Sequence, residues 1–320
     1  MLVVVCPGQG AQSPGMLAPW LELPDLADRL GTYSDVVGLD LAVHGTTSDA
    51  ATICDTAVAQ PLLVATALLT FQAVLAGSRG GVDAVAGHSV GEFGAAVIAG
   101  VLTAGQALDL VAVRGAAMAR AAAATPTGMS ALLGGDPDEV LARLAELGLT
   151  AANVNGAGQV VAAGTLEALA ALTLAPPARA RVIPLQVAGA FHTTHMAPAV
   201  AELAARAAAV EPADPQITLL SNADGVAVAS GTRALARLVA QVANPVRWDL
   251  CQRTLQELGV TGLLELAPAG VLTGLARRTL PGVETVAVKT PADLDAARDL
   301  VRRHGGSATI PALDSQENPS

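Results

Sequence analysis

The sequence predicts an α/β protein in which a parallel-sheet core carries a small inserted domain. Residues 1–6 are apolar throughout and run into the glycine loop PGQGAQ, which is typical of a buried parallel strand. A second, mostly apolar run, residues 82–86, leads through GHSVG into a long helical pattern. This repeated strand-then-helix order indicates a parallel sheet covered on both faces. A change to the order β-α-β-β-α-β from Met129 indicates the insertion.

The composition supports a folded core and limits the classes of partner. The chain has 320 residues, of which 52% are hydrophobic and 14% charged, so a disordered protein is excluded. The net charge of −10 argues against nucleic acid or an anionic membrane surface as a partner. The three cysteines, Cys6, Cys54 and Cys251, show no metal-ligand spacing and suit a reducing cytoplasm. The first apolar stretch is short and has no basic leader, so we expect no signal peptide.

An uncharged apolar stretch, residues 57–77, follows the first strand and is long enough to span a bilayer. However, Gln60, Pro61 and other polar residues interrupt it, and Pro61 fits the first turn of a soluble helix. We therefore expect a helix buried in the core and not a membrane span. A further helical pattern covers about 91–123.

The pentapeptide GHSVG places Ser89 at the junction between the second strand and its helix. Glycines flank such a sharp turn because side chains there would obstruct the strained backbone. The turn exposes the serine Oγ, and the amides that follow lie at a helix N-terminus, where they can stabilise negative charge. Glycine-rich turns with an incidental serine also occur, but the order of strand, turn and long helix favours a nucleophile elbow.

The inserted unit reads as a strand (MSALLG), a helix (PDEVLARLAELG), a strand pair (AANVNG and QVVAAG), a second helix (LEALAALTLA) and a last strand (ARVIPLQV). This is the order of a ferredoxin-like unit. We expect residues 126–189 to form the inserted domain, residues 1–125 and 190–304 the core, and residues 305–320 a disordered tail. The core resumes with helices at about 196–210, 232–242, 249–258, 271–278 and 291–303, and strands at about 217–221, 262–266 and 285–288.

A serine nucleophile needs a base, and the chain has five histidines. His44 falls in a polar loop, His304 opens the tail, and His88 is adjacent to the serine on a turn that should point the two side chains apart. His192 and His195 remain, in GAFHTTHM, where the inserted domain returns to the core. That segment should border an interdomain crevice, a usual place for active sites. Two histidines in a solvated loop are an equally open interpretation of the residues alone.

Several motifs in order resemble one family: PGQGAQ, GHSVGE, VRGAAM, NVNGAGQVVAAG, GAFHTTHM and QVANPVRW. They are similar to those of the malonyl-CoA:acyl carrier protein transacylase family, and the resemblance runs from residue 1 to about residue 303. It implies an α/β-hydrolase-like core with a ferredoxin-like insertion. The family's histidine lies four residues before a methionine, which selects His192 with Met196 as the marker and leaves His195 without a catalytic role.

The resemblance also implies a ping-pong mechanism without metal or cofactor. Ser89 would attack the malonyl thioester while His192 accepts its proton, and the carrier protein's phosphopantetheine thiol would then take the malonyl group. The family's oxyanion hole corresponds to the main-chain amides of Gln9 and Val90. Its histidine is oriented by a carbonyl group at the position of Gln241, so no carboxylate is required.

Substrate selection is implied at four further positions. Arg114 is a lone charge in an alanine-rich stretch, which usually means a surface arginine. However, the family places its malonate-binding arginine there, and a guanidinium suits a carboxylate. Phe191 resembles the residue that excludes an α-methyl group in malonyl-selective acyltransferases, and Gln60 and Asn155 would line the acyl pocket. A capping or core role for Gln60 is about as well supported.

Two departures from the family pattern lie in loops. The segment NGAGQ, residues 155–159, lacks the family's usual proline, and APAG, residues 267–270, replaces Gly-Pro-Gly. Neither includes the expected nucleophile, base or arginine, so they bear only on loop rigidity and the edges of the pocket.

Two other functions share parts of this pattern. A serine thioesterase or esterase would require an Asp or Glu to orient the histidine and would give no reason for Arg114. The acyltransferase subunit of a malonate decarboxylase would load a different carrier. We expect a cytoplasmic monomer whose partners are malonyl-CoA and an acidic acyl carrier protein. Arg277 and Arg278 are candidates for contacting that carrier.

Overall fold

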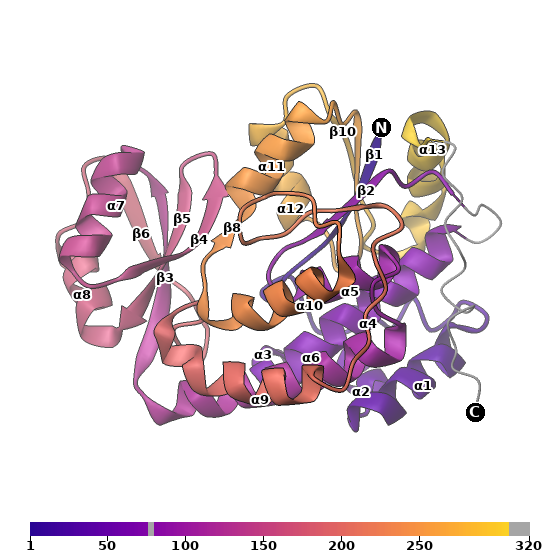
Figure 1. Ribbon diagram of the computed structural model, residues 1–320, viewed down its shortest axis with the longest axis horizontal. Coiled ribbons are helices and arrows are strands. Elements are labelled where there is room, and N and C mark those ends of the chain that lie inside the picture. Colours follow the sequence, from indigo (N-terminus) through magenta and orange to yellow (C-terminus); the bar gives the residue numbers. More distant parts are fainter. Residues whose placement is uncertain (76–79, 307–320) are drawn as a thin grey trace.

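The computed structural model describes residues 1–75 and 80–306, which form two sheets and the helices around them (Figure 1). The core sheet has the order β10-β9-β1-β2-β7, and every pair in it is parallel. Its strands are β1 (Leu2–Cys6), β2 (Ala84–Gly87), β7 (Thr218–Leu219), β9 (Gly262–Glu265) and β10 (Glu284–Ala287). The expected parallel-sheet α/β core is therefore confirmed.

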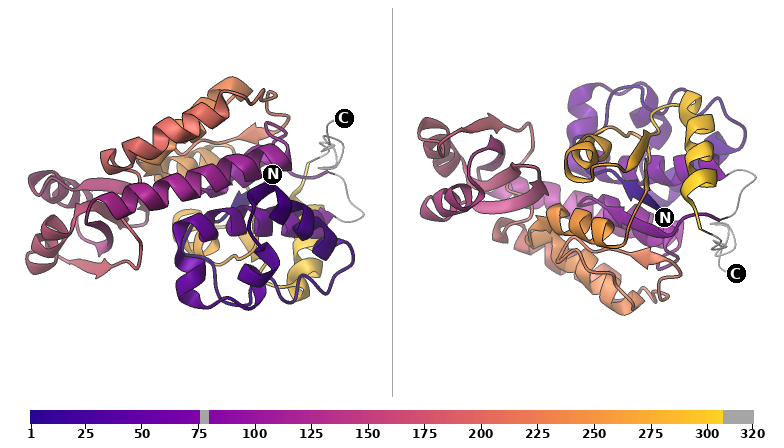
Figure 2. Two further views of the ribbon diagram at one scale, coloured as in Figure 1. Left: turned by 90° about the horizontal axis from the view of Figure 1, so that it is seen from below. Right: turned by 90° about the horizontal axis from the view of Figure 1, so that it is seen from above.

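Alternate side chains of β1 pack into two different clusters, because successive residues of a strand point to opposite faces of the sheet. Val4 packs with helices α4 (Thr56–Leu75), α5 (Gly91–Ile98), α6 (Ala104–Ala124) and α13 (Leu294–His304). Val3 and Val5 pack with helices α11 (Trp248–Glu257) and α12 (Val271–Thr279). Both faces of the sheet are covered (Figures 1 and 2), which explains the continuous apolar run in the sequence.

The second sheet has the order β6-β3-β5-β4-β8. Its strands are β3 (Thr127–Gly134), β4 (Thr150–Gly156), β5 (Gln159–Thr165), β6 (Ala180–Pro184) and β8 (Val246–Arg247). The first four pair antiparallel in the ferredoxin-like arrangement, while β8, from the core part of the chain, adds a parallel strand beside β4. Helices α7 (Pro137–Glu146) and α8 (Leu166–Leu174) cover one face, at the left of Figure 1. We propose residues 126–189 as the inserted domain on this basis.

The turn between β4 and β5 carries one of the departures from the family pattern. Gly156 and Gly158 have φ angles of 78° and 72°, and Ala157 between them has a φ of 49°. Proline cannot adopt a positive φ, so the segment without the family's proline forms a turn that a proline at this position would prevent.

The helix expected over 91–123 is two helices, α5 and α6. Gly100 adopts a φ of 80° after α5, and Thr103 then caps α6 in a capping box with Gln106. Both signals are present in the sequence as a glycine followed by Thr-x-x-Gln.

The apolar helix α4 begins earlier than expected. It starts at Thr56, because the Asp55 carboxylate accepts a hydrogen bond from the Ala57 N–H at 2.8 Å. Pro61 is the sixth residue of the helix, so it lies inside the helix and not in its first turn. By length and composition α4 could cross a membrane, but 83% of its most apolar stretch is buried inside the protein. The expected core helix is thus the one observed.

Three helices near the N-terminus were not predicted: α1 (Leu26–Val37), α2 (Leu41–Thr46) and α3 (Ala50–Cys54). The side chains of Asp40 and Asp49 cap α2 and α3. His44, expected in a polar loop, lies in α2, where its Nδ1 is 3.1 Å from Ser48 Oγ.

The remaining helices are α9 (Ala197–Ala207) and α10 (Gly231–Ala240), with short 3-10 turns at Thr194–Met196, Gln241–Ala243 and Pro291–Asp293. In the view from below in Figure 2, α6 reaches from the core toward the second sheet, and α9 runs beside it. The 3-10 turn Thr194–Met196, which follows His192, contacts both α6 and α9.

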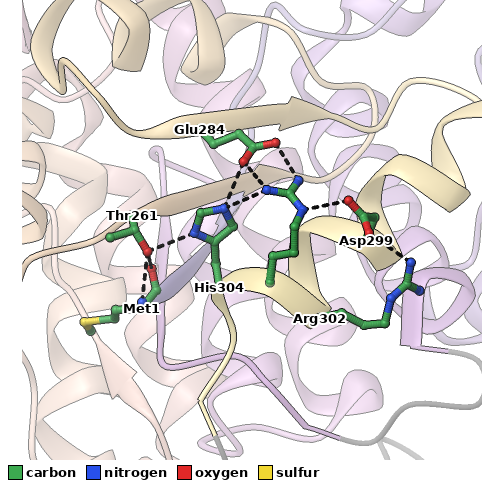
Figure 3. Close-up of polar contacts among 7 residues, drawn as sticks. Met1, Thr261, Glu284, Asp299, Arg302 and His304 are labelled. Carbon is green, nitrogen blue, oxygen red and sulfur yellow. Dashed lines mark hydrogen bonds and ion pairs between the residues drawn. The ribbon is translucent and has the colours of Figure 1, made fainter.

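A polar network lies at the amino ends of strands β1, β9 and β10 (Figure 3). His304, at the end of α13, contacts Thr261 Oγ1 through Nδ1 and Glu284 Oε2 through Nε2, each at 2.9 Å. Arg303 pairs with Glu284 and with Asp299. The histidine that was expected to open the tail is thus part of the last helix. Most of the expected tail, residues 307–320, lies outside the described residues.

Candidate active site

The adjacent parallel strands β1 and β2 place two loops side by side at their carboxyl ends. The register pairs Cys6 with Gly87, so the glycine loop after β1 meets the GHSVG turn after β2. A Cβ on Gly87 would lie 2.0 Å from the carbonyl carbon of Gly91, and a Cβ on Gly91 would lie 2.2 Å from the carbonyl oxygen of Cys6. Ser89 itself has a φ of 54°. The expected glycine clearance and strained serine are both present.

The side chains of Ser89 and His192 are in contact. Ser89 Oγ lies 2.8 Å from His192 Nε2, and His192 Nδ1 lies 2.8 Å from the main-chain oxygen of Gln241. Because that carbonyl oxygen can only accept, Nδ1 carries the proton and Nε2 is free to accept the serine proton. His192 also has a φ of 61°, so both partners are held in a conformation that non-glycine residues rarely adopt.

The environment keeps this imidazole neutral. Burial, the positive charge of Arg114 and the nearby His88 together lower the pKa of His192 to about 3, although its hydrogen bond to Gln241 opposes the shift. At neutral pH the ring is therefore unprotonated and can act as a base.

Arg114 lies directly beneath the serine and is fully buried, so it is not the surface arginine that its helix would suggest. Its Nη1 donates to Gln60 Oε1 at 2.6 Å, and its Nη2 donates to Gln241 Oε1 at 3.0 Å and to Ser89 Oγ at 3.5 Å. The guanidinium also lies over the ring of Phe93, at 5.9 Å from its centroid. Burial lowers the pKa of Arg114 to about 10, so it remains charged at neutral pH.

Gln60 is held by this arginine and does not cap its helix. It lies in the second turn of α4, is buried, and bonds through Oε1 to Arg114. The side chain of Gln60 also lines the cavity above Ser89.

Two buried polar residues near the serine were missed by the sequence analysis, Glu92 and Asn222. Asn222 Oδ1 accepts the main-chain N–H of Ser89 at 2.8 Å, and its Nδ2 donates to the Gly87 carbonyl at 2.8 Å. Glu92 accepts the main-chain N–H of Asn222 at 2.6 Å and a hydrogen bond from the Gln241 side chain. Burial raises the pKa of Glu92 to about 8. The sequence signal for Glu92 was its position as the single acid in an otherwise uncharged helix.

A cavity of about 450 Å³ opens above the serine, between the core and the second sheet. The expected site residues that line it are Gln9, Gln60, Ser89, Asn155, Phe191 and His192. The hydrogen bonds of the described residues use neither the main-chain amide of Gln9 nor that of Val90. Of these two residues, Gln9 lines the cavity and Val90, which is fully buried, does not.

Asn155 lines the cavity but its side chain also holds a histidine. Asn155 Oδ1 lies 2.9 Å from His88 Nε2, and the His88 ring packs edge-on against Trp248, with centroids 5.7 Å apart. His88 is thus held by Asn155 and Trp248, and it lines the same cavity as Ser89. His195 lies in the 3-10 turn that follows His192 and does not line the cavity. In residues 1–75 and 80–306, no cluster of three or more His, Cys, Asp or Glu side chains could hold a metal ion.

An elbow serine on a parallel α/β sheet, in contact with a histidine that a main-chain carbonyl orients, defines the class of serine enzymes that act through an acyl-serine. A family model described as "Acyl transferase domain" matches residues 3–298. A malonyl CoA-acyl carrier protein transacylase from Mycobacterium tuberculosis is 55% identical over 305 residues, which cover 94% of this chain and 100% of the relative. The chain belongs to the malonyl CoA-acyl carrier protein transacylase family.

Solved structures agree with this assignment. The crystal structure of MCAT from Mycobacterium tuberculosis matches with a TM-score of 0.89 and 55% identity, covering 93% of this chain and 99% of that chain. A type II PKS acyl-carrier protein in complex with its malonyl-transacylase provides a second match, with a TM-score of 0.86 and 32% identity over 93% of this chain and 99% of that one. The α/β-hydrolase-like core with a ferredoxin-like insertion is thus the fold of known transacylases.

Proposed function

We propose that this protein transfers the malonyl group from malonyl-CoA to the phosphopantetheine thiol of an acyl carrier protein, through a malonyl-serine on Ser89. The observation that carries the proposal is a buried, charged Arg114 whose guanidinium lies 3.5 Å from the hydroxyl of an activated serine. A positive charge at this distance matches an acyl group that ends in a carboxylate. The family assignment supports the same substrate.

In the first half-reaction, Ser89 Oγ attacks the thioester carbon while its proton moves to His192 Nε2. The carbon–sulfur bond breaks, and the coenzyme A thiolate leaves with the proton from His192. The carbonyl of Gln241 stabilises the imidazolium that forms in between, because it accepts from Nδ1 at 2.8 Å. The thioester oxygen becomes negative in the tetrahedral intermediate, and the unused amides of Gln9 and Val90 supply its oxyanion hole.

The second half-reaction reverses these steps with the carrier's thiol. His192 accepts the thiol proton, the sulfur attacks the malonyl-serine ester, and the proton returns to Ser89 Oγ as the ester bond breaks. The single histidine serves both directions because Nε2 faces the same oxygen throughout.

Arg114 has an unused donor for the incoming carboxylate. Its Nε is buried and has no hydrogen-bond partner within the described residues. A buried donor without an acceptor is costly, and a malonyl carboxylate would supply one. We assign Gln60, Asn155 and Phe191 to the walls of the acyl pocket, because all three border the cavity that contains Ser89. Phe191 would exclude an α-methyl substituent by occupying its space.

Replacing Arg114 with alanine should change which acyl group is transferred. A buried guanidinium paired with a carboxylate contributes about 2–5 kcal/mol, judged from truncation of such pairs. We therefore expect kcat/KM for malonyl-CoA to fall roughly thirtyfold to several thousandfold in Arg114→Ala. Acetyl-CoA has no carboxylate to lose, so its transfer should be spared or improved. A parallel fall for both substrates would assign Arg114 to the structure and remove the chemical argument for malonyl.

The two rival functions differ from this proposal in testable ways. A thioesterase would orient its histidine with a carboxylate, whereas His192 is oriented by a carbonyl. A decarboxylase subunit would share the malonyl site but load another carrier.

The test that separates these functions supplies the enzyme and malonyl-CoA with purified fatty-acid carrier protein, with a malonate decarboxylase carrier, or with water alone. We expect malonyl transfer to the first. Release of free malonate, or preference for the second carrier, would identify a rival.

The last turn of α12 is our candidate for docking an acidic carrier. Arg277 and Arg278 lie there, both exposed, and α12 also lines the active-site cavity through Val271 and Leu275. The protein is itself acidic, with a net charge of −10, so local positive charge is needed to attract an acidic partner.

We further propose that the protein acts as a monomer in the cytoplasm.

Reversing both charges, Arg277→Glu with Arg278→Glu, should raise the apparent KM for the carrier and make it less sensitive to salt. The KM for malonyl-CoA in the first half-reaction is the internal reference. The matched control reverses Arg253, which is exposed on α11 and paired with Glu257. An unchanged carrier KM in the double variant would end this docking hypothesis.

A further inference from the structure

Glu92 is a buried carboxyl group that the mechanism above leaves without a role. It lies on α5, three residues after Ser89, and is only 4% exposed. Its two hydrogen bonds come from the main-chain N–H of Asn222 and from the side-chain amide of Gln241. A buried carboxyl group is expensive to keep, so its place directly under the nucleophile points to a function.

The side chain of Gln241 links Glu92 to Arg114. Gln241 Nε2 faces only oxygen atoms: the Ser89 carbonyl at 3.1 Å, Asn222 Oδ1 at 3.3 Å and a carboxyl oxygen of Glu92. Its Oε1 accepts from Arg114 Nη2 at 3.0 Å. Because an amide has one donor side and one acceptor side, the oxygens around Nε2 determine that Oε1 faces the arginine.

We propose that Glu92 is a positioning residue for Arg114, which it holds in place for the malonyl carboxylate through the side-chain amide of Gln241. This inference rests on the proposed function, in which Arg114 binds that carboxylate. A carboxyl group can accept from both Asn222 and Gln241, whether or not it carries a proton, since each oxygen keeps a lone pair.

A glutamine at position 92 could satisfy only one of these two donors. The Asn222 N–H belongs to the main chain and cannot turn, so the new amide would keep its oxygen there and direct its NH₂ group at Gln241 Nε2. Two donors would then face each other. Rotation of the Gln241 amide would relieve this conflict but would present its NH₂ group to Arg114. The guanidinium then loses the acceptor of Nη2 and shifts from its position.

The test compares kcat/KM for malonyl-CoA and acetyl-CoA in Glu92→Gln and the wild type. We expect the malonyl-to-acetyl ratio to fall about fivefold to a hundredfold, the effect of one buried donor left without a partner. Acetyl transfer should change little, because His192 is held by the main-chain carbonyl of Gln241 and not by its side chain. A parallel loss for both substrates, or an unchanged ratio, would overturn the proposal.

Glu265 offers a matched control. It is also a fully buried glutamate, and it accepts three main-chain N–H groups, from Gly270, Leu272 and Thr273. Glu265→Gln should lower the melting temperature without changing the malonyl-to-acetyl ratio. An equal change of the ratio in this control would mean that any buried-glutamate substitution disturbs selectivity, and would overturn the proposal.

The arginine variant separates failure of this inference from failure of the proposed function. In an Arg114→Ala background, Glu92→Gln should not alter the ratio further, because the group that it positions is gone. If Arg114→Ala changes the ratio and Glu92→Gln does not, the inference is wrong and the function stands. If Arg114→Ala itself leaves the ratio unchanged, the role of the arginine has failed and the inference falls with it.

Gln241→Met tests the same link should Glu92→Gln not fold. It keeps the main-chain carbonyl for His192 and removes only the side-chain amide. We expect the same selective loss of malonyl transfer. A variant that retains full malonyl selectivity would overturn the proposal.

Discussion

Ser89→Ala should abolish acyl transfer and leave the fold intact. The change removes one oxygen atom that contacts His192 Nε2 at 2.8 Å and faces the cavity. We expect the rate of transfer from malonyl-CoA to fall by about four to six orders of magnitude, as loss of the nucleophile from a serine–histidine unit does. The measurement is single-turnover release of coenzyme A, which reports the first half-reaction alone.

The circular dichroism spectrum and the melting temperature are the controls that show whether Ser89→Ala still folds. The left-handed φ of 54° is kept only because the glycines clear the turn, and alanine can occupy it at a similar cost to serine. The circular dichroism spectrum and melting temperature of Ser89→Ala should therefore match the wild type closely. Residual transfer within tenfold of the wild type would mean that another group carries the malonyl intermediate.

His192→Ala should slow both half-reactions by about three to six orders of magnitude, because Ser89 loses its base and the coenzyme A thiolate loses its proton donor. The matched control is His195→Ala, three residues along the same segment, which should cost little since His195 does not line the cavity. Coenzyme A release and carrier loading, measured separately, give the two half-reactions. Reversal of the two results would assign the base to His195.

The pH profile offers an independent check of the same histidine. Burial and the charge of Arg114 lower the pKa of His192 to about 3, so the neutral base persists well below its usual titration range. Because kcat/KM reports ionisations of the free enzyme, the profile for malonyl-CoA should show no loss from this group between neutral pH and about pH 5. A fall centred near the usual histidine pKa, absent in His192→Ala, would contradict this environment.

Local patterns predicted the sharp turn at Ser89 and the sheet that carries it. Gly87 and Gly91 are needed where backbone passes within van der Waals contact, and that need is visible in a five-residue stretch. The six-element order of the ferredoxin-like unit was also visible in local patterns, because each strand and helix has its own apolar period. The resemblance then selected His192. The residues alone supported a catalytic base and a histidine in a solvated loop about equally.

The support around the site depends on contacts that no local pattern contains. Glu92 and Asn222 are 130 positions apart, and Ser89 and Asn222 are 133 apart. Strand β8 is only two residues long and gains its partner from the other part of the chain. The prediction of one continuous helix over about 91–123 was wrong for a different reason. Its apolar period continues across Gly100, while the capping box at Thr103 that ends this continuity was overlooked.

The central claim is that a malonyl group passes from coenzyme A to a carrier protein by way of Ser89. The most direct measurement is mass spectrometry of peptides from enzyme mixed with labelled malonyl-CoA, before and after addition of phosphopantetheinylated carrier protein. We predict the label on the peptide that contains Ser89, and its quantitative movement to the carrier's thiol when the carrier is added. Label on the peptide of Cys54, the exposed thiol that lines the same cavity, would contradict the serine mechanism. Label that leaves Ser89 as free malonate would contradict the transferase.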